Sequence, residues 1–539
     1  MKHNSIEFDD LPFSKLFKDY LSKSGTISDY FHTHPFDDEA LKKKAKSHSF
    51  LSDRKEIVSL LTEFQSDFNA PELTYAQINQ LDDPQSLAVV TGQQLTVYGG
   101  PLFTVYKTLT AIIYAKKWSE KLDRPIIPVF WLADEDHDYE EVITLGLPKN
   151  GTTSSISYAQ SLPGKFSPPV GEIQFTEEIL SFKKEIKEYL GDTDFHDKLW
   201  DDIHQAYGKN QTFKVAFGNW LLHLFGDQGL VLAGSQTKPI KTFSSNIIKQ
   251  SIIKNDQINK ALDDTTYKLI SDQYHGQVQV QSSNMFYLDD EKNRTKISVD
   301  GKVWSAAEKK WTCDELIAEI DDSPERFSPN VFLRPILQDY LLPTLAYVGG
   351  PGEIGYYAQM KSLYQLFGME MPIIVPRFSM TLIESSVDRV LDKLPFSIAE
   401  YNNRIEDLEK SFVKKTEEVD IEKLFGIWKN QMEDLTKAKK NEIHKVDSSL
   451  AGSVGKAKAV YFSELDKLKG KVYKSVKQQE KIQLDRIAKI KNNLFPNNNL
   501  QEREIAFIYF MNKYGPDIWK KVEETINEER PDNHKLIYL

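Results

Sequence analysis

Five short runs of apolar residues, each ended by a polar turn, recur along the first 380 residues of the chain. They lie at 87–90, 126–132, 229–234, 344–348 and 371–375. Apolar residues at helical spacing follow the first run, from Phe103 to Trp118, and the fourth run, from Tyr356 to Phe367. Buried parallel strands have such apolar runs, and strands that alternate with helices form βαβ units. The pattern therefore predicts an α/β core, residues 1–380, with five parallel strands.

Two segments interrupt this pattern. The first, about residues 145–228, lies between the second and third strands and is mostly helical in its apolar spacing. The second, about residues 275–330, alternates polar and apolar residues between turn signals. Its Asp300-Gly301 step, between two short alternating runs, predicts a hairpin within a small antiparallel meander. Both segments are expected to be insertions in the α/β core.

One short helix can be predicted from its first turn. Thr312, Cys313, Asp314 and Glu315 have the residue types of a capping box, so Cys313 is predicted to begin a helix. A thiol at a helix start can be acidified, although a cysteine without an assigned base is more often structural.

Residues 381–492 are charged and rich in helix-forming residues. Apolar residues recur there at approximately heptad spacing, namely Leu450, Val454, Tyr461, Leu465, Leu468, Val472, Val476 and Ile482. This is the pattern of a coiled-coil domain. One helix cannot bury such a stripe alone, so we expect the arm to fold back or to form a homodimer; the alternative is a long solvated helix. Residues 493–539 change character again and are predicted to return to the α/β core.

The composition limits the classes of function. A formal charge of −11 over 539 residues argues against a nucleic-acid partner. The single cysteine allows no disulfide within the chain and no zinc site built from several cysteines. Acidic residues stand where a signal peptide needs an apolar run, and no stretch approaches the ~18 apolar residues of a membrane span. We therefore expect a cytoplasmic protein without a membrane partner.

A polar turn follows the first predicted strand. It consists of Thr91, Gly92, Gln93 and Gln94, which are candidate substrate-binding residues. Parallel strands place such turns at the carboxyl edge of the sheet, where α/β proteins bind ligands. The turn matches neither G-x-G-x-x-G nor G-x-x-x-x-G-K-[ST], which disfavours the common dinucleotide and P-loop sites. Glutamine amides suit a polar substrate instead; the alternative is an ordinary strand-to-helix loop.

The second strand ends in an acidic turn, which should face the same cleft. It contains Asp134, Glu135, Asp136, His137 and Asp138. The last three are the catalytic candidates, because a carboxylate or imidazole at this edge can act as general base. Carboxylates here also suit Mg²⁺, although the identity of any metal stays unknown. If the cluster is desolvated, mutual repulsion should raise the pKa of some of these carboxyls. The alternative is a solvated acidic loop.

A glycine turn at residues 349–353 is the third element of this edge. Helix starts favour anions, and an arginine nearby suits a carboxylate or a phosphate. Glu353 is in a position to orient an amine. The alternative is a purely structural turn. The substrate-binding candidates of this region are Arg334, Gln338, Gly352, Glu353, Tyr357 and Arg377.

Five segments of the chain together resemble one known family. They are VVTGQQ, GGPLFTVYKTLTAI, PVFWLADEDHDYEEV, GGPGEIGYYAQM and PNNNLQERE. In residue type and order they are similar to the cysteine ligase family of bacillithiol synthesis, over almost the whole chain. The sequence departs from the family at Leu95-Thr96-Val97-Tyr98, where a Gly/Leu-rich loop is more usual.

The resemblance implies a Rossmann-like core with two connecting-peptide insertions, similar in outline to class I aminoacyl-tRNA synthetases, and a dimer formed by the coiled coil. It implies a ligase that joins the carboxyl of L-cysteine to the amine of glucosaminyl-malate, giving bacillithiol. Neither a His-Ile-Gly-His type signature nor a clear Lys-Met-Ser-Lys-Ser loop is present, so the activation chemistry stays open.

Amide formation from a free carboxylate in water is unfavourable, so we expect activation by ATP with Mg²⁺, through an acyl adenylate or an acyl phosphate. Asp136, His137 or Asp138 would take the proton of the amine. The malate carboxylates would bind Arg334, Arg377 or Lys107. A second pocket is expected at Gln501, Glu502 and Arg503.

Two other classes of function fit the same residues. One is a nucleotidyltransferase or metal-dependent hydrolase that uses the same cleft. The other is a non-catalytic coiled-coil protein whose core only binds a ligand. Catalysis predicts that replacement of His137 or Asp136 abolishes the thiol product while the fold persists.

Overall fold

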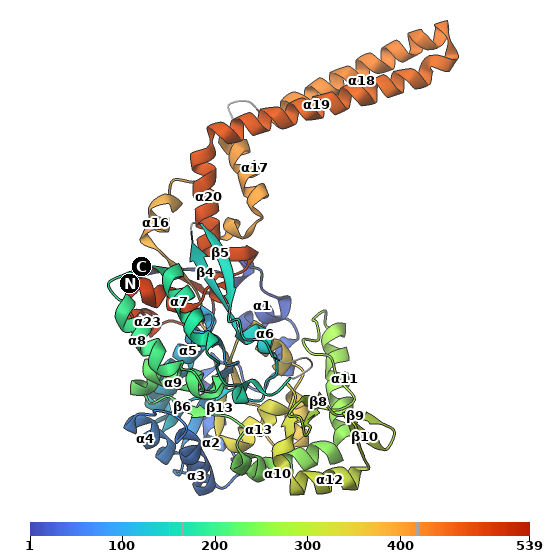
Figure 1. The fold of residues 1–539 in the computed structure, drawn as a ribbon. Coiled ribbons are helices and arrows are strands. Elements are labelled where there is room, and N and C mark those ends of the chain that lie inside the picture. The colour runs from blue at the N-terminus through green and yellow to red at the C-terminus, as the bar shows by residue number, and fades with distance from the viewer. Residues whose placement is uncertain (150, 163–166, 417–419) are drawn as a thin grey trace. The chain divides into compact units, whose positions relative to one another are not determined.

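A computed structural model describes residues 1–149, 151–162, 167–416 and 420–539. Residues 150 and 163–166, in the first predicted insertion, and 417–419, in the predicted arm, lie outside the described residues. The chain forms two compact units, drawn in Figure 1. The first unit comprises 1–149, 153–382 and 501–537, and the second comprises 150–152, 383–500 and 538–539.

The core of the first unit is one sheet of five parallel strands in the order β14-β13-β2-β3-β6. The strands are β2 (Leu87–Gln93), β3 (Ile126–Leu132), β6 (Val231–Ala233), β13 (Thr344–Gly349) and β14 (Ile373–Pro376). Every predicted apolar run forms a strand of this sheet, so the predicted α/β fold class is confirmed. Gly92 pairs with Trp131 and Gln93 with Leu132, so the first two polar turns begin at the same level of the sheet.

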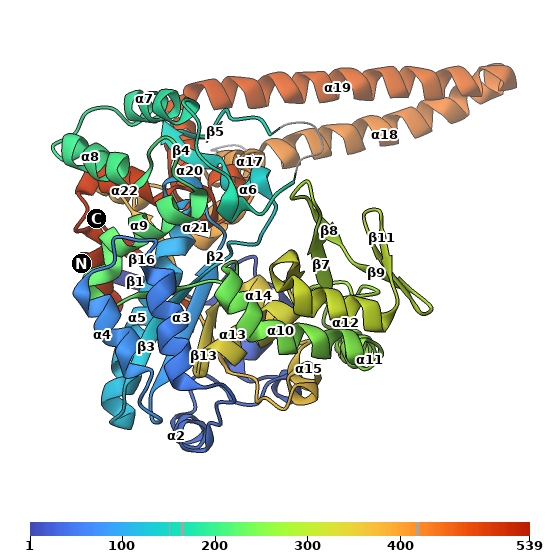
Figure 2. The same ribbon diagram turned by 60° about the horizontal axis from the view of Figure 1, so that its bottom comes forward.

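Helices bury this sheet, which explains why its strands are continuously apolar. The long helix α5 packs against β2 and β3 (Figure 2), and α3 and α4 pack against β6. Before β14, the helices outside the two insertions are α1 (Lys15–Ser22), α2 (Asp38–Ser47), α3 (Arg54–Gln65), α4 (Glu72–Gln80), α5 (Leu102–Leu122), α6 (Tyr139–Val142), α10 (Lys238–Ile253), α11 (Asn255–Ser271), α13 (Leu333–Leu341), α14 (Pro351–Tyr357) and α15 (Lys361–Leu366).

In its described residues, the first insertion contains a two-stranded sheet and three helices. They are β4 (Thr144–Lys149), β5 (Thr152–Ser157), α7 (Glu178–Leu190), α8 (His196–Ala206) and α9 (Phe213–Phe225). Helix α9 carries a Thr212 cap, whose side chain accepts a hydrogen bond from the backbone N–H of Val215. The helical interpretation of this segment is therefore confirmed for the described residues.

The second insertion forms two small antiparallel sheets, in the orders β12-β7-β8 and β11-β10-β9. The strands are β7 (Met285–Leu288), β8 (Arg294–Lys296), β9 (Ser298–Asp300), β10 (Val303–Ala306), β11 (Lys309–Trp311) and β12 (Phe327–Pro329). Gly301, with a φ of 57°, makes the predicted turn between β9 and β10. The capping box of Thr312 and Glu315 begins α12 (Cys313–Asp322), as predicted. Burial, and then the negative charge of Asp314, raise the pKa of the Cys313 thiol.

The C-terminal residues contribute to a further, three-stranded sheet, in the order β1-β16-β15. Its strands are β1 (Lys2–Ile6), β15 (Ser379–Ile383) and β16 (His534–Tyr538), and the helices of this segment are α21 (Gln501–Glu504), α22 (Phe507–Tyr514) and α23 (Ile518–Ile526). The strand predicted at the end of the sequence is therefore present, with a strand on each side.

The second unit is helical, and its longest helices form an antiparallel coiled-coil hairpin. The helices are α16 (Ser385–Leu391), α17 (Ile405–Thr416), α18 (Ile421–Val446), α19 (Ala451–Gln479) and α20 (Lys481–Leu494). Ile421 and Phe425 of α18 pack on Leu465 of α19. The arm therefore folds back on itself, which was one of the two expected ways of burying the heptad stripe. Among the described residues, no helix is long and apolar enough to cross a membrane.

Candidate active site

A cleft with two lobes lies at the carboxyl edge of the parallel sheet, within the first unit. The glutamine-side lobe, about 420 Å³, includes Gln93, Gln94, Lys107, Gly352, Glu353 and Arg503 in its lining. The carboxylate-side lobe, about 550 Å³, includes Asp134, Glu135, Asp136, Arg294 and Lys296. Both lobes share Trp131, Ala133, Val278, Val331 and Arg334, so they are adjacent. The two predicted polar turns thus meet at one cleft.

The first turn forms hydrogen bonds both to a neighbouring strand, through Thr91, and to the acidic loop, through Gln94. The Thr91 hydroxyl donates a hydrogen bond of 2.9 Å to the Val348 carbonyl, so Thr91 is buried between strands rather than exposed to a ligand. The Gln94 amide donates to Asp136 Oδ2 and to Glu141 Oε2, at 2.8 Å each. Gln94 therefore holds the two loops together at the edge of the lobe.

Lys107 and Glu353 form an ion pair in the wall of the glutamine-side lobe, with an Nζ–Oε2 distance of 2.5 Å. The ammonium also donates to the Gly92 carbonyl at 2.8 Å. Glu353 accepts from the Gly350 N–H at 2.8 Å and from the Tyr347 hydroxyl at 2.6 Å. Burial alone would raise the pKa of Glu353, but Lys107 and the Gly350 N–H outweigh it and lower the pKa. Because each charge is compensated by the other, this pair forms part of the wall of the lobe and is not a free binding group for a ligand.

The arginines of this lobe differ in whether their charge is compensated. Arg377 is buried and paired with Glu502 at 2.7 Å. Arg334 instead donates to the neutral side chains of Gln338 and Tyr356, at 3.0 Å each. Arg503, on α21, is exposed and lines the lobe. Among the described residues, Arg334 and Arg503 have no carboxylate partner, which leaves two guanidinium charges for an anionic ligand.

Four candidates lie in the interior instead of facing a ligand. Gln338 positions Arg334, and Tyr357 packs on the ring of Tyr347. Gln501 accepts from the Leu382 N–H at 2.8 Å and donates to the Leu382 carbonyl at 2.9 Å. Glu502 is fully buried against Arg377. Gln501 and Glu502 are therefore buried against partners that are distant in the sequence and do not face a second pocket as predicted, whereas Arg503 lines the glutamine-side lobe.

The carboxylates of the acidic loop turn to separate partners. Asp134 accepts from the backbone N–H groups of Ser235 and Gln236, and burial raises its pKa to about 7. Glu135 pairs with Lys241. Asp136 accepts from Gln94. The three carboxylates therefore diverge and do not form a metal site together. Nowhere among the described residues do three His, Cys, Asp or Glu side chains come together as possible ligands for a metal ion.

The three catalytic candidates are not equivalent. Asp136 lines the carboxylate-side lobe, whereas His137 and Asp138 line a different hollow beside Tyr139. Nδ1 of His137 lies 2.8 Å from Nη1 of Arg294, a residue of β8 that does line the lobe. Burial, and then the positive charge of Arg294, lower the pKa of His137. Asp138 is exposed. Of the three, Asp136 alone lines the cleft.

Models of two protein domains match the sequence. Residues 1–378 match the N-terminal Rossmann-like domain of bacillithiol biosynthesis BshC, and residues 380–539 match its C-terminal coiled-coil domain. The chain belongs to the BshC family. This membership assigns it to bacillithiol biosynthesis and confirms both the resemblance and the Rossmann-like fold with a coiled-coil domain.

Relatives align with this BshC family member over nearly their whole length. Those of Salinibacter ruber, Chloroherpeton thalassium and Chlorobaculum tepidum are 33%, 31% and 30% identical, over 96%, 99% and 98% of this chain and 95%, 99% and 97% of their own. Each is named "Putative cysteine ligase BshC". The family is one of ligases, so the chain is an enzyme.

The cleft also contains two cationic side chains that the sequence analysis did not predict as site residues, Arg294 and Lys296. They belong to the second insertion, and they stand two residues apart on β8, so that both point to one face of the strand. This spacing was visible in the sequence. The sequence did not show which face of the meander lies against the edge of the parallel sheet, because that depends on contacts between distant segments.

Proposed function

We propose that this enzyme joins the carboxyl of L-cysteine to the amine of glucosaminyl-malate in the cytosol, with a carboxyl activated by ATP. Family membership and the names of the relatives support the reaction. The observation that carries the assignment of the site is the charge pattern of the cleft. In the described part of the chain, both lobes contain guanidinium groups without a carboxylate ion-pair partner, and the carboxylate-side lobe also contains the carboxylate of Asp136, as a substrate with both anionic and amine groups requires.

The glutamine-side lobe suits glucosaminyl-malate. Its malate part has two carboxylates, and planar guanidinium groups bind carboxylates through paired hydrogen bonds. Arg334 and Arg503 supply two such groups in this lobe. The amide of Gln93 offers donors and an acceptor to sugar hydroxyls. We assign malate to the arginines and the sugar to the glutamine turn.

Asp136 is the proposed general base. A protonated amine cannot attack a carbonyl, so one group near the junction of the lobes must accept its proton. Asp136 lines the carboxylate-side lobe and is held by the Gln94 amide at 2.8 Å. This contact fixes one carboxylate oxygen, so the side chain is oriented before the substrate binds.

ATP is the proposed source of activation, and Mg²⁺ is expected to accompany its phosphates. A nucleotide needs cationic side chains to balance its charge. Besides Arg334, the carboxylate-side lobe contains Arg294 and Lys296. This donor set fits a phosphate chain. Because the carboxylates of the acidic loop diverge, we expect Mg²⁺ to bind the phosphates of ATP rather than a site formed by protein side chains alone.

The direct test incubates the protein with cysteine, glucosaminyl-malate, ATP and Mg²⁺ and detects bacillithiol by mass spectrometry. Product should require all components, and AMP or ADP should appear with it in equal amount. Nucleotide cleavage without thiol product would favour a hydrolase or nucleotidyltransferase instead. No product and no nucleotide cleavage would contradict the ligase assignment.

We also propose that the enzyme is a homodimer formed through the coiled coil. The hairpin of α18 and α19 leaves Leu424, Ile427, Leu435, Val460 and Leu468 exposed. A second copy is the occupant that heptad spacing favours. Light scattering should give twice the chain mass, and Ile427→Lys with Leu468→Lys should give monomers. A monomeric wild-type protein would contradict this proposal.

A further inference from the structure

Arg294 is a half-buried cation whose hydrogen-bond partners are all neutral. Nε donates to the Ser328 hydroxyl at 2.9 Å, Nη1 to His137 Nδ1 at 2.8 Å, and Nη2 to the Pro329 carbonyl at 3.0 Å. The guanidinium carbon lies 3.8 Å from the centre of the Phe286 ring. Among the described residues, no carboxylate forms an ion pair with it. Its geometry is therefore fixed while its charge is not compensated by a direct partner.

In this contact His137 can only be the hydrogen-bond acceptor. A guanidinium group can only donate, so Nδ1 of His137 must be the acceptor and carries no proton. The proton of the neutral imidazole then lies on Nε2. A second proton, at Nδ1, would replace this hydrogen bond by repulsion between two cations. His137 is thus suited to orient Arg294 and is unsuited to accept a proton during the reaction.

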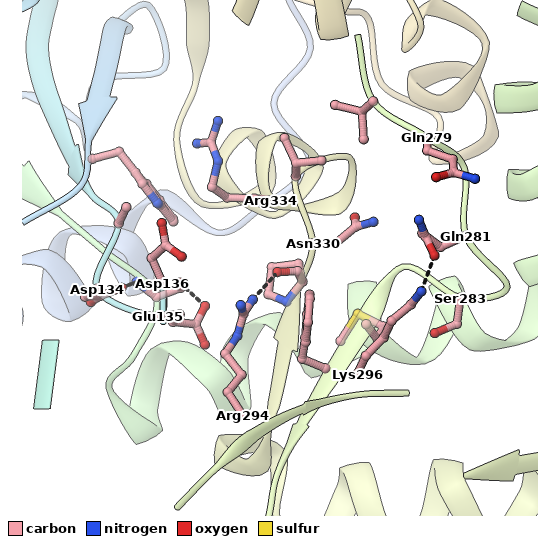
Figure 3. Close-up of a pocket in the computed structure, with 18 residues that line it drawn as sticks. Asp134, Glu135, Asp136, Gln279, Gln281, Ser283, Arg294, Lys296, Asn330 and Arg334 are labelled. Atoms are coloured by element: carbon pink, nitrogen blue, oxygen red, sulfur yellow. Dashed lines mark hydrogen bonds between the residues drawn. The ribbon is translucent and has the colours of Figure 1, made fainter. Parts of the chain in front are cut away.

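Lys296 extends the positive charge along the same strand face. Its ammonium donates to Gln281 Oε1 and, like Arg294, it has no carboxylate partner among the described residues. Figure 3 shows Arg294 and Lys296 on one side of the carboxylate-side lobe, with Asp136 and Arg334 also around it. Glu135, which lies in the same lobe, is already paired with Lys241. The second insertion therefore gives this lobe two cations that, among the described residues, have no carboxylate within ion-pair distance; Glu135 and Asp136 act on Arg294 only from farther away.

We propose that Arg294 and Lys296 form an anion subsite of the cleft, and that His137 is a positioning residue that holds Arg294. This inference rests on the proposed ligase function and extends it to the second insertion. The anion is an oxygen anion of a substrate, either the phosphate chain of ATP or the carboxylate of cysteine. Both present the planar or tetrahedral oxygens that guanidinium and ammonium groups bind.

Steady-state kinetics separate these two sources. KM is measured for ATP, cysteine and glucosaminyl-malate in turn, with the other two saturating. Arg294→Gln and Lys296→Gln should each raise the same single KM about tenfold or more, since each removes a charged hydrogen-bond donor. A rise for ATP identifies phosphate, and a rise for cysteine identifies its carboxylate. The matched control is Lys302→Gln, an exposed lysine of the same insertion, which should leave all three values unchanged.

The positioning role has its own pair of variants. His137→Asn keeps an acceptor for Arg294 and should stay within about threefold of the wild type, whereas His137→Leu should raise the same KM as Arg294→Gln. If Asn and Leu are equally harmful in kcat and leave KM unchanged, His137 acts in the chemistry and the positioning role is wrong. If neither Arg294→Gln nor Lys296→Gln changes any KM more than twofold, the anion subsite is wrong.

A binding measurement keeps this test independent of turnover. Inorganic triphosphate and cysteine are each added to the protein, and the thermal midpoint is recorded. One of them should raise the midpoint of the wild type and fail to raise that of Arg294→Gln. If the wild type makes no bacillithiol but shows this difference, the ligase proposal fails and the anion subsite stands. If neither compound shifts the wild type, the subsite is overturned.

Discussion

Single hydrogen bonds decide which polar residues of the cleft are free for a substrate. Glu353 has three donors from the protein, whereas Arg334 has two neutral acceptors. A buried charge that is already paired gains little from a ligand, whereas an uncompensated charge gains much. Whether a charge is already paired therefore separates substrate-binding residues from structural ones better than position in the sequence does.

Arg334 should determine affinity for glucosaminyl-malate. Arg334→Gln is expected to raise its KM between about tenfold and a hundredfold, because a charged hydrogen-bond donor to a carboxylate is lost. Arg334→Lys should recover only part of this, because lysine cannot make the paired contact. Arg404→Gln, an exposed arginine of the second unit, is the control. Unchanged KM in Arg334→Gln would remove the malate carboxylates from this residue.

Asp136 and Asp138 provide a matched pair for the general base. Asp136→Asn should lower kcat by about a hundredfold or more, the usual contribution of general base catalysis. Asp138→Asn removes the same charge two residues away, outside the cleft, and should be nearly wild type. Single-turnover rates at saturating substrate make the comparison. Equal losses in both variants would indicate a general electrostatic effect of the acidic loop instead.

At the scale of elements, the close approach of β2 and β3 depends on one glycine. A Cβ at Gly92 would lie 2.8 Å from the Trp131 carbonyl oxygen, near the carboxyl ends of the paired strands. Gly92→Ala should therefore destabilise the first unit by about 1–3 kcal/mol, as overpacking does. Gly470, in α19, has open space around its Cβ position, so Gly470→Ala should stabilise its helix slightly. Urea unfolding of both variants tests this, and an unchanged midpoint for Gly92→Ala would show that the strands can separate freely.

Local signals predicted the elements, and long-range contacts determined the site. The apolar runs, the Asp300-Gly301 turn and the capping box each depend on neighbouring residues, so the sequence alone revealed them. The pairing of Glu502 with Arg377 joins residues that are 125 positions apart. No periodicity encodes such a contact, which is why Glu502 was interpreted as part of a pocket. Arg294 escaped prediction for the same reason.

At the scale of the whole molecule, histidines that are partly or fully buried link stability to pH. Burial lowers the pKa of His34, His48 and His534 to about 4 each. The unfolded chain therefore binds protons first as the pH falls below about 6.5, and the folded state loses stability between there and about pH 4. Asp134 acts in the opposite direction, because its pKa is raised to about 7. Asp339, whose pKa burial raises to about 6, acts in the same direction as Asp134. Three histidines against these two carboxyls still predict a net loss.

His534 allows this dependence to be tested at one site. It is fully buried between the hydroxyls of Ser379 and Thr381, at 2.8 Å from each. Its lowered pKa corresponds to about 2 kcal/mol of lost stability between pH 7.5 and pH 5. His534→Asn should lose correspondingly less over this interval, whatever its stability at pH 7.5. Parallel pH profiles for the variant and the wild type would contradict the assignment.

The origin of the charges in the carboxylate-side lobe bears on how this cleft can change over evolution. Its acids come from the end of a core strand, whereas Arg294 and Lys296 come from a hairpin of the second insertion. The hairpin has its own backbone pairing with β7, so substitutions on its exposed face leave the parallel sheet intact. A lineage can therefore acquire preference for a different anionic partner by altering one small surface hairpin, while the residues that handle the amine are inherited unchanged.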